Sequence, residues 1–284
     1  MATFATSDQL LVIIDPAARQ RDGESVRIAK DVLSAGATAK VCLPQGPEEF
    51  ARALGRRGSR RPVVVGDDRA LVRAVTLLHR QRELAGCALS VVPVGVTALA
   101  ESLGVPAGPV AAARAVLEGA ERRLDLLVDD SDGVVLSALG IPPAPARAAA
   151  VEPVGVPTGR PWLRTRYRSL VRTLAPRPTR LTTVPAPGPS RLRVEVDGET
   201  VVDLDQPVEA VTVAPGGRGA ATVEVRPLSG PGAEATPLLA EGRRVTVTGA
   251  DFRYRADAVV SGPVRRREWT VREGAWGLTL PLPG

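Results

Sequence analysis

Hydrophobic residues in the first half of the chain occur either in short unbroken runs or at helical spacing. Unbroken runs are typical of buried strands, and they predict strands at Leu10–Ile14, Ala39–Leu43, Val63–Val65, Ala88–Val92 and Leu124–Val128. The stretches between the runs have apolar residues on one side of a helix, and they predict helices at Gly23–Ser34, Pro47–Leu54, Leu71–Leu78, Thr97–Leu103 and Pro109–Glu118. Strands that are apolar throughout and alternate with helices indicate a parallel sheet covered on both faces.

The hydrophobic pattern changes to a period of two from Leu192 onward, which is typical of strands with one buried face. Asp197-Gly198 lies between two apolar runs and predicts a hairpin turn. Further short strands are expected at Val211–Val213, Thr222–Val225, Val245–Thr248, Ala258–Val260, Trp269–Val271 and Leu278–Leu280. The fold class is therefore α/β, with a parallel-sheet domain at residues 8–140. An all-β, sandwich-like domain is expected at residues 145–284, with a final segment that can pack on the first domain.

Prolines mark the segment between the two predicted domains, and Trp162–Leu174 interrupts it with a helical pattern. Apolar residues share one face of this predicted helix, and Arg164, Arg168 and Arg172 line another. A basic amphipathic helix can lie in the interface of an anionic bilayer. The apolar face can equally pack on the β-rich domain of the protein itself, so both interpretations stay open.

The composition narrows the functional classes. Only 3% of the 284 residues are aromatic, and the net charge of +6 comes almost entirely from arginine. The arginines reflect either a compositional bias or a preference for anions, and the lack of a recognition motif argues against sequence-specific nucleic-acid binding. No apolar run is long enough to cross a bilayer, and the first residues lack the basic start of a signal peptide. With Cys42 and Cys87 as isolated thiols, a cytoplasmic protein is expected.

One strand, loop and helix unit carries the strongest functional signal. The strand Val63–Val65 stops at Gly66, the polar residues Asp67, Asp68 and Arg69 follow, and helical spacing begins at Ala70. Loops of this kind at the carboxyl end of a strand bind phosphates in α/β proteins, because the first N–H groups of the helix are unpaired and the helix dipole favours an anion.

Five segments, in order along the chain, resemble the diacylglycerol kinase catalytic-domain family, lipid kinases that share a fold with NAD kinases. The segments are LLVIIDPAA (Leu10–Ala18), VVVGDDRAL (Val63–Leu71), VVPVGVTALAESLGVP (Val91–Pro106), ERRLDLLVDD (Glu121–Asp130) and GAWGLTLP (Gly274–Pro281). The resemblance implies an NAD kinase-like first domain and an ATP-dependent kinase that phosphorylates a lipid hydroxyl with Mg²⁺. It also implies that a glycine-rich loop holds the ATP phosphates.

The resemblance assigns candidate site residues in the first domain. Asp68 is the catalytic candidate, and nucleotide binding is assigned to Asp15, Gly66, Asp67, Asp68, Arg69, Gly95, Val96 and Thr97. The general base is not identified, because the family's acidic Asp-Gly-Glu segment falls on Ser261-Gly262-Pro263. Asp251 or Asp257 can supply a carboxylate instead. No cluster of Cys and His residues predicts a bound metal.

The predicted phosphate loop departs from the family pattern. Asp67 and Arg69 replace two of its glycines, and Ala70 replaces its threonine. A carboxylate facing triphosphate should cost a few kcal/mol if water is excluded, although Arg69 can pair with phosphate and compensate in part. The favoured hypothesis is a degenerate lipid-kinase relative that is catalytically weak or silent and binds nucleotide or anionic lipid, with peripheral association at the inner membrane face. An active lipid kinase and a non-catalytic regulatory or structural partner are the alternatives.

Overall fold

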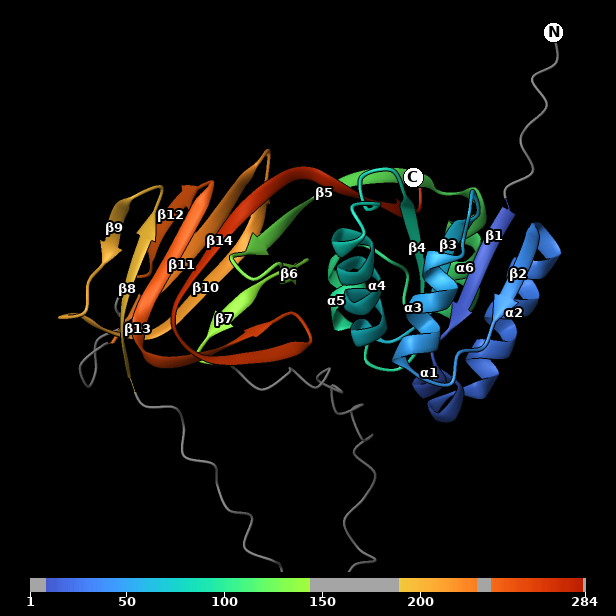
Figure 1. Cartoon of the computed structure of the whole chain (residues 1–284), viewed down its shortest axis with the longest axis horizontal. Helices are drawn as coiled ribbons and strands as arrows, with labels where there is room; N and C mark the ends of the chain where they lie inside the picture. Colours follow the sequence, from blue (N-terminus) through green and yellow to red (C-terminus); the bar gives the residue numbers. More distant parts are fainter. Residues whose placement is uncertain (1–8, 144–188, 229–235, 283–284) are drawn as a thin grey trace, which may run out of the picture. The chain divides into compact units, whose positions relative to one another are not determined.

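A computed structural model of the chain describes residues 9–143, 189–228 and 236–282 (Figure 1). The predicted helix at Trp162–Leu174 lies outside the described residues. No helix in the described ranges is long and apolar enough to cross a membrane.

Four strands of the first half form a parallel sheet, as the apolar runs predict. They are ordered β2 (Thr38–Cys42), β1 (Gln9–Ile14), β3 (Arg61–Gly66) and β4 (Ala88–Pro93). The predicted fifth strand exists as β5 (Ala120–Asp129), but its assignment to the parallel sheet is wrong. It pairs antiparallel with the last strand, β14 (Val259–Leu280), because Gly277 and Leu278 of that strand occupy the position beside β4.

Six helices accompany this sheet in the described part of the chain. They are α1 (Pro16–Arg21), α2 (Gly23–Gly36), α3 (Pro47–Gly55), α4 (Asp68–Arg80), α5 (Ala98–Ser102) and α6 (Pro109–Glu118). Helix α2 contacts α6, and α3 contacts α4. The step from β1 to β2 runs in the opposite direction to the step from β2 to β3. Right-handed connections therefore place α2 and α3 on opposite faces of the sheet.

The described residues after α6 form antiparallel strands. They are β5, β6 (Val134–Val135), β7 (Leu139–Ile141), β8 (Ser190–Val196), β9 (Glu199–Val202), β10 (Pro207–Gly217), β11 (Ala220–Pro227), β12 (Leu238–Gly242), β13 (Arg244–Ala256) and β14 (Val259–Leu280). Asp197 and Gly198 have φ of 51° and 91° and form the turn between β8 and β9, as predicted. The strands belong to one hydrogen-bonded sheet, in which β5, β6, β8 and β9 pair beside the main path. The finer expectation of a sandwich stays a prediction.

Two predicted strands near the C-terminus differ in detail from the structure. Val259 and Val260 of the strand expected at Ala258–Val260 begin β14, whereas Ala258 lies in the turn before it, next to Asp257 with a φ of 47°. The two strands expected at Trp269–Val271 and Leu278–Leu280 are parts of the single strand β14.

The core consists of two clusters of buried side chains. The first is built from the parallel sheet and its helices, and it includes Trp276, Leu278 and Leu280 of β14. The second is built from the antiparallel strands, where the ring of Trp269 meets that of Tyr254 edge-on at 5.3 Å between centroids. Because β14 supplies tryptophans to both clusters, the last strand ties the two parts of the core together.

Candidate functional site

The loops that follow β1, β3 and β4 are held together by backbone hydrogen bonds. The N–H of Asp15 donates to Val65 O at 2.9 Å, the N–H of Val94 to Gly66 O at 2.9 Å, and the N–H of Asp68 to Val96 O at 2.9 Å. These bonds bring together the residues that the sequence assigns to nucleotide binding, and the helices α1, α4 and α5 begin here. The carboxyl edge of the parallel sheet is therefore the candidate site.

Asp15 closes the N-terminus of α1. Its carboxylate accepts the N–H of Ala17 at 2.9 Å, and Pro16 occupies the first helical position, where no N–H is needed. The second carboxylate oxygen accepts a bond from Arg73 at 2.8 Å. Asp15 is buried, so its charge is compensated inside the protein.

Asp67 closes the N-terminus of α4, where the sequence predicts bound phosphate. Its carboxylate accepts the N–H of Ala70 at 3.1 Å, and its backbone oxygen accepts the N–H groups of Ala70 and Leu71. Together with the bond from Asp68 to Val96, three of the first four N–H groups of α4 already have an acceptor in the protein. The exposed guanidinium of Arg21 lies 3.6 Å from the Asp67 carboxylate.

Asp68 is buried and closes a different helix. Its two carboxylate oxygens accept the N–H groups of Leu99 at 3.0 Å and Ala100 at 3.1 Å, at the start of α5. Burial raises the pKa of Asp68, and the negative charges of Asp67 and Glu101 add to the increase, while the bonds from Leu99 and Ala100 oppose it. The catalytic candidate thus connects the β3–α4 loop to the segment after β4.

The two glycines of the site permit close approach of the loops. A Cβ on Gly66 would lie 2.8 Å from the Cβ of Ala70 and 3.1 Å from that of Asp15, so a larger residue would force the loops apart. Gly95 has a φ of +104°, a backbone conformation that residues other than glycine rarely adopt. Both positions therefore require the glycine that the sequence supplies.

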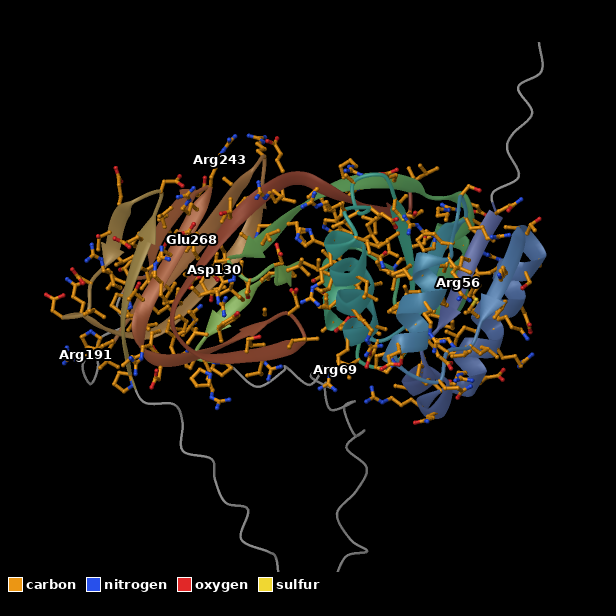
Figure 2. All side chains as sticks on the ribbon, viewed as in Figure 1. Arg56, Arg69, Asp130, Arg191, Arg243 and Glu268 are labelled. Carbon is orange, nitrogen blue, oxygen red and sulfur yellow. The ribbon has the colours of Figure 1, made fainter. Side chains whose placement is uncertain are left out.

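The remaining candidates lie on the surface of the site. Arg69 and Val96 are exposed, and Arg69 is labelled in Figure 2. The hydroxyl of Thr97 donates to Glu101 at 2.6 Å. The cations Arg21 and Arg73 were missed by sequence reasoning, because each pairs with an aspartate of another loop and no local pattern indicates that contact.

Asp257 follows strand β13 in the antiparallel part of the sheet, and its charge interacts with that of Asp68 in the site. It accepts the N–H groups of Leu136, Ser137 and Ala138 at 2.7, 2.9 and 3.2 Å. Burial raises the pKa of Asp257 to about 6, the three N–H bonds oppose the increase, and the negative charge of Asp68 adds to it.

The other acidic candidates behave differently. The segment Ser261-Gly262-Pro263, on which the family's acidic motif falls, lies within β14 beyond the turn and carries no carboxylate. Asp251 is exposed and forms an ion pair with Arg265 at 3.1 Å. The sequence offers two carboxylates as a base. Of these, Asp257 is the one whose charge interacts with a residue of the site, Asp68.

Side chains alone do not build a Mg²⁺ site at this edge. Among the described residues, no group of three His, Cys, Asp or Glu side chains is arranged to hold a metal. Mg²⁺ usually binds through one or two carboxylates together with substrate phosphates. Both oxygens of Asp68 and Asp257 and one oxygen of Asp67 already accept backbone N–H groups.

Comparison with known proteins finds solved structures that have a similar fold. No protein-family model and no curated protein matches the sequence. Three solved structures, all described as diacylglycerol kinases of Bacillus anthracis str. Sterne, match the structure with TM-scores of 0.69, 0.68 and 0.68. Each match covers 97% of this chain and 98% of the other, at 13, 12 and 12% sequence identity. At such identities the match shows a shared fold, which is the fold that the five sequence segments predict.

Proposed function

We propose that this chain is a diacylglycerol kinase-like protein that transfers phosphate weakly or not at all and that binds nucleotide or anionic lipid. The fold shared with diacylglycerol kinases supports the kinase-like part. One observation carries the loss of activity: the helices after β1, β3 and β4 are all closed at their N-termini by aspartates of the chain itself. The acceptors that a phosphate would provide are already present.

The energy of this arrangement disfavours a triphosphate beside α4. Two like unit charges 4 Å apart repel by about 4 kcal/mol near a protein surface. Such a penalty corresponds to about a thousandfold loss of affinity. Arg21 and Arg69 are the cations of this region that remain exposed, and they support weak nucleotide binding of the kind we propose.

The decisive experiment is a transfer assay with radiolabelled ATP over a panel of lipid acceptors that includes diacylglycerol. We expect little or no labelled lipid, together with measurable ATP binding by calorimetry that changes little when Mg²⁺ is removed. Robust turnover that Asp68→Ala abolishes would instead support an active kinase. A protein that neither binds ATP nor labels lipid would be a regulatory or structural partner.

An active lipid kinase remains the second candidate because of Asp257. A carboxylate with a pKa of about 6 is close to the range in which general bases operate. Its charge also interacts with that of Asp68. If the transfer assay shows activity, Asp257→Asn should lower kcat and leave KM nearly unchanged, because the base acts in the transition state.

The lipid part of the proposal rests on the sequence of Trp162–Leu174. Each arginine near an anionic surface contributes about 1 kcal/mol, screened by salt. Sedimentation with phosphatidylglycerol vesicles should therefore decrease steeply between low and physiological salt. It should be lost in Arg164→Glu with Arg168→Glu at an unchanged melting temperature. A wild-type protein that ignores these vesicles at low salt would remove the membrane interpretation.

A further inference from the structure

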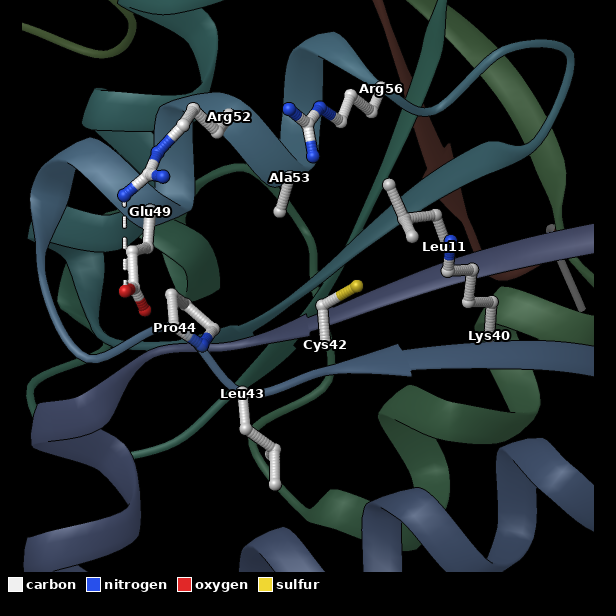
Figure 3. A pocket seen from close by; sticks show the side chains of 9 residues that line it. All are labelled: Leu11, Lys40, Cys42, Leu43, Pro44, Glu49, Arg52, Ala53 and Arg56. Atoms are coloured by element: carbon white, nitrogen blue, oxygen red, sulfur yellow. Dashed lines mark ion pairs between the residues drawn. The ribbon is translucent and has the colours of Figure 1, made fainter.

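A hollow of about 330 Å³ lies between the edge strand β2 and helix α3 (Figure 3). Lys40 and Cys42 are two residues apart on β2, so they share one face of the strand, and both line the hollow. Arg52 and Ala53 of α3, with Arg56 directly after the helix, line the opposite wall. None of the candidate nucleotide-binding residues contributes to this hollow.

Positive charge dominates the walls of the hollow. Three cations and one carboxylate line it, namely Lys40, Arg52, Arg56 and Glu49. Glu49 is already used, because it accepts the backbone N–H of Gln45 at 2.8 Å and pairs with Arg52 at 3.9 Å. Among the described residues, Lys40 and Arg56 have no ion-pair partner. The hollow therefore offers two uncompensated positive charges to a ligand.

Apolar side chains also line the hollow. Leu11, Pro44 and Ala53 contribute to it. In Figure 3, Lys40 and Arg56 lie at one end of the hollow and Pro44 at the other, whereas the Leu43 side chain points away from α3. A ligand that satisfies both ends has an anionic head and an apolar body.

We propose that this hollow binds a small organic phosphate, with its dianionic head between Lys40 and Arg56 and its apolar body over Ala53 and Pro44. The two uncompensated charges match the charge of a phosphate monoester, and a guanidinium binds phosphate through a pair of hydrogen bonds. The volume holds on the order of ten non-hydrogen atoms, since a water occupies about 30 Å³. The proposal is independent of nucleotide binding at the carboxyl edge of the sheet.

Phenyl phosphate is a suitable probe because it has the charge and size that the hollow requires. We expect saturable, single-site binding to the full chain in equilibrium dialysis, weakened by salt. Removing both charges in Lys40→Gln with Arg56→Gln should weaken binding at least tenfold. The matched control, Lys30→Gln with Arg114→Gln, removes the same charge from exposed positions on α2 and α6 and should bind like the wild type.

Cys42 locates the bound probe. Its thiol lines the hollow, whereas Cys87 is buried elsewhere. Phenyl phosphate should slow the alkylation of Cys42 by iodoacetamide in the wild type and in the control, but not in the Lys40→Gln, Arg56→Gln variant.

Three results would overturn the proposal. Absence of saturable binding of phenyl phosphate at low salt would remove the site. Equal binding by the wild type and the double variant would place the phosphate elsewhere. Equal affinity for inorganic phosphate would contradict the apolar half of the proposal and leave a site for free phosphate.

Discussion

At the level of single residues, the neighbouring aspartates Asp67 and Asp68 accept hydrogen bonds from two different helices. Asp67 caps the helix that follows it, which its position before a helical pattern predicts. Asp68 instead holds α5, about thirty residues later in the chain. No local pattern indicates that contact, so sequence reasoning found the residue and missed its structural role. The catalytic assignment of Asp68 stays a prediction.

The capping role of Asp68 leads to a prediction about stability. Asp68→Ala leaves the N–H groups of Leu99 and Ala100 without their acceptors, and loss of a helix cap costs about 1–2 kcal/mol. Asp68→Asn retains one acceptor oxygen and should lose less. Urea denaturation measures both variants, with Asp31→Ala on the exposed side of α2 as a control. Equal stability of Asp68→Ala and the wild type would contradict the capping contact.

Asp257 should make stability depend on pH. Its pKa in the folded protein is about 6, above the ordinary value of 3.8. The folded state therefore holds the proton more tightly, and this contribution is present below pH 4 and lost as the pH rises through 6. At 1.36 kcal/mol per pH unit the loss is about 3 kcal/mol.

The measurement compares urea denaturation of the wild type and Asp257→Asn between pH 4 and 7. The wild type should lose stability relative to the variant as the pH rises. Asp251→Asn is the matched control, because Asp251 is exposed and paired with Arg265. Parallel pH profiles for the wild type and Asp257→Asn would show that Asp257 titrates normally.

At the level of helices and strands, sequence patterns predict an element correctly where its side chains are buried along most of its length. The strands β1, β3 and β4 are buried beyond their first residue because helices cover them, whereas the edge strand β2 is partly exposed. Helix α6 has the predicted bounds. Helix α1 was missed because its six residues are too short for a hydrophobic period. Strand β14 was predicted as separate pieces, because Arg265 and Arg266, and later Arg272 and Glu273, break its apolar pattern at exposed positions.

The N-terminus of α4 allows a test of the phosphate loop as an element. Asp67→Gly with Arg69→Gly removes the carboxylate that accepts the Ala70 N–H and restores two glycines of the family pattern. ATP affinity by calorimetry should increase if the loop still meets phosphate, since about 4 kcal/mol of repulsion is removed at most.

Asp67→Asn separates charge from backbone geometry in this test. Asparagine is as good a helix cap as aspartate, so this variant removes the negative charge and keeps the helix start. Affinity that increases in both variants identifies the charge as the obstacle. Affinity that changes in neither would mean that the loop does not meet the nucleotide.

The whole molecule is joined by its last strand. β14 pairs with β13 and β5 over most of its length, and near its end it pairs in parallel with β4. The buried hydroxyl of Ser90 on β4 donates to Thr279 on β14 at 2.9 Å. Trp269 and Trp276, seven residues apart on the same strand, are fully buried in different clusters. Because one strand is shared, neither cluster can lose it without disturbing the other.

We therefore expect the two clusters to unfold together. In a Trp162→Phe background, Trp269→Phe leaves Trp276 as the fluorescent reporter of the first cluster, and Trp276→Phe leaves Trp269 as the reporter of the second. Within each variant, fluorescence and circular dichroism should give one urea midpoint, because coincident probes are the mark of a single cooperative transition. Separated midpoints would mean that the clusters unfold independently and that β14 bends or frays between residues 269 and 276.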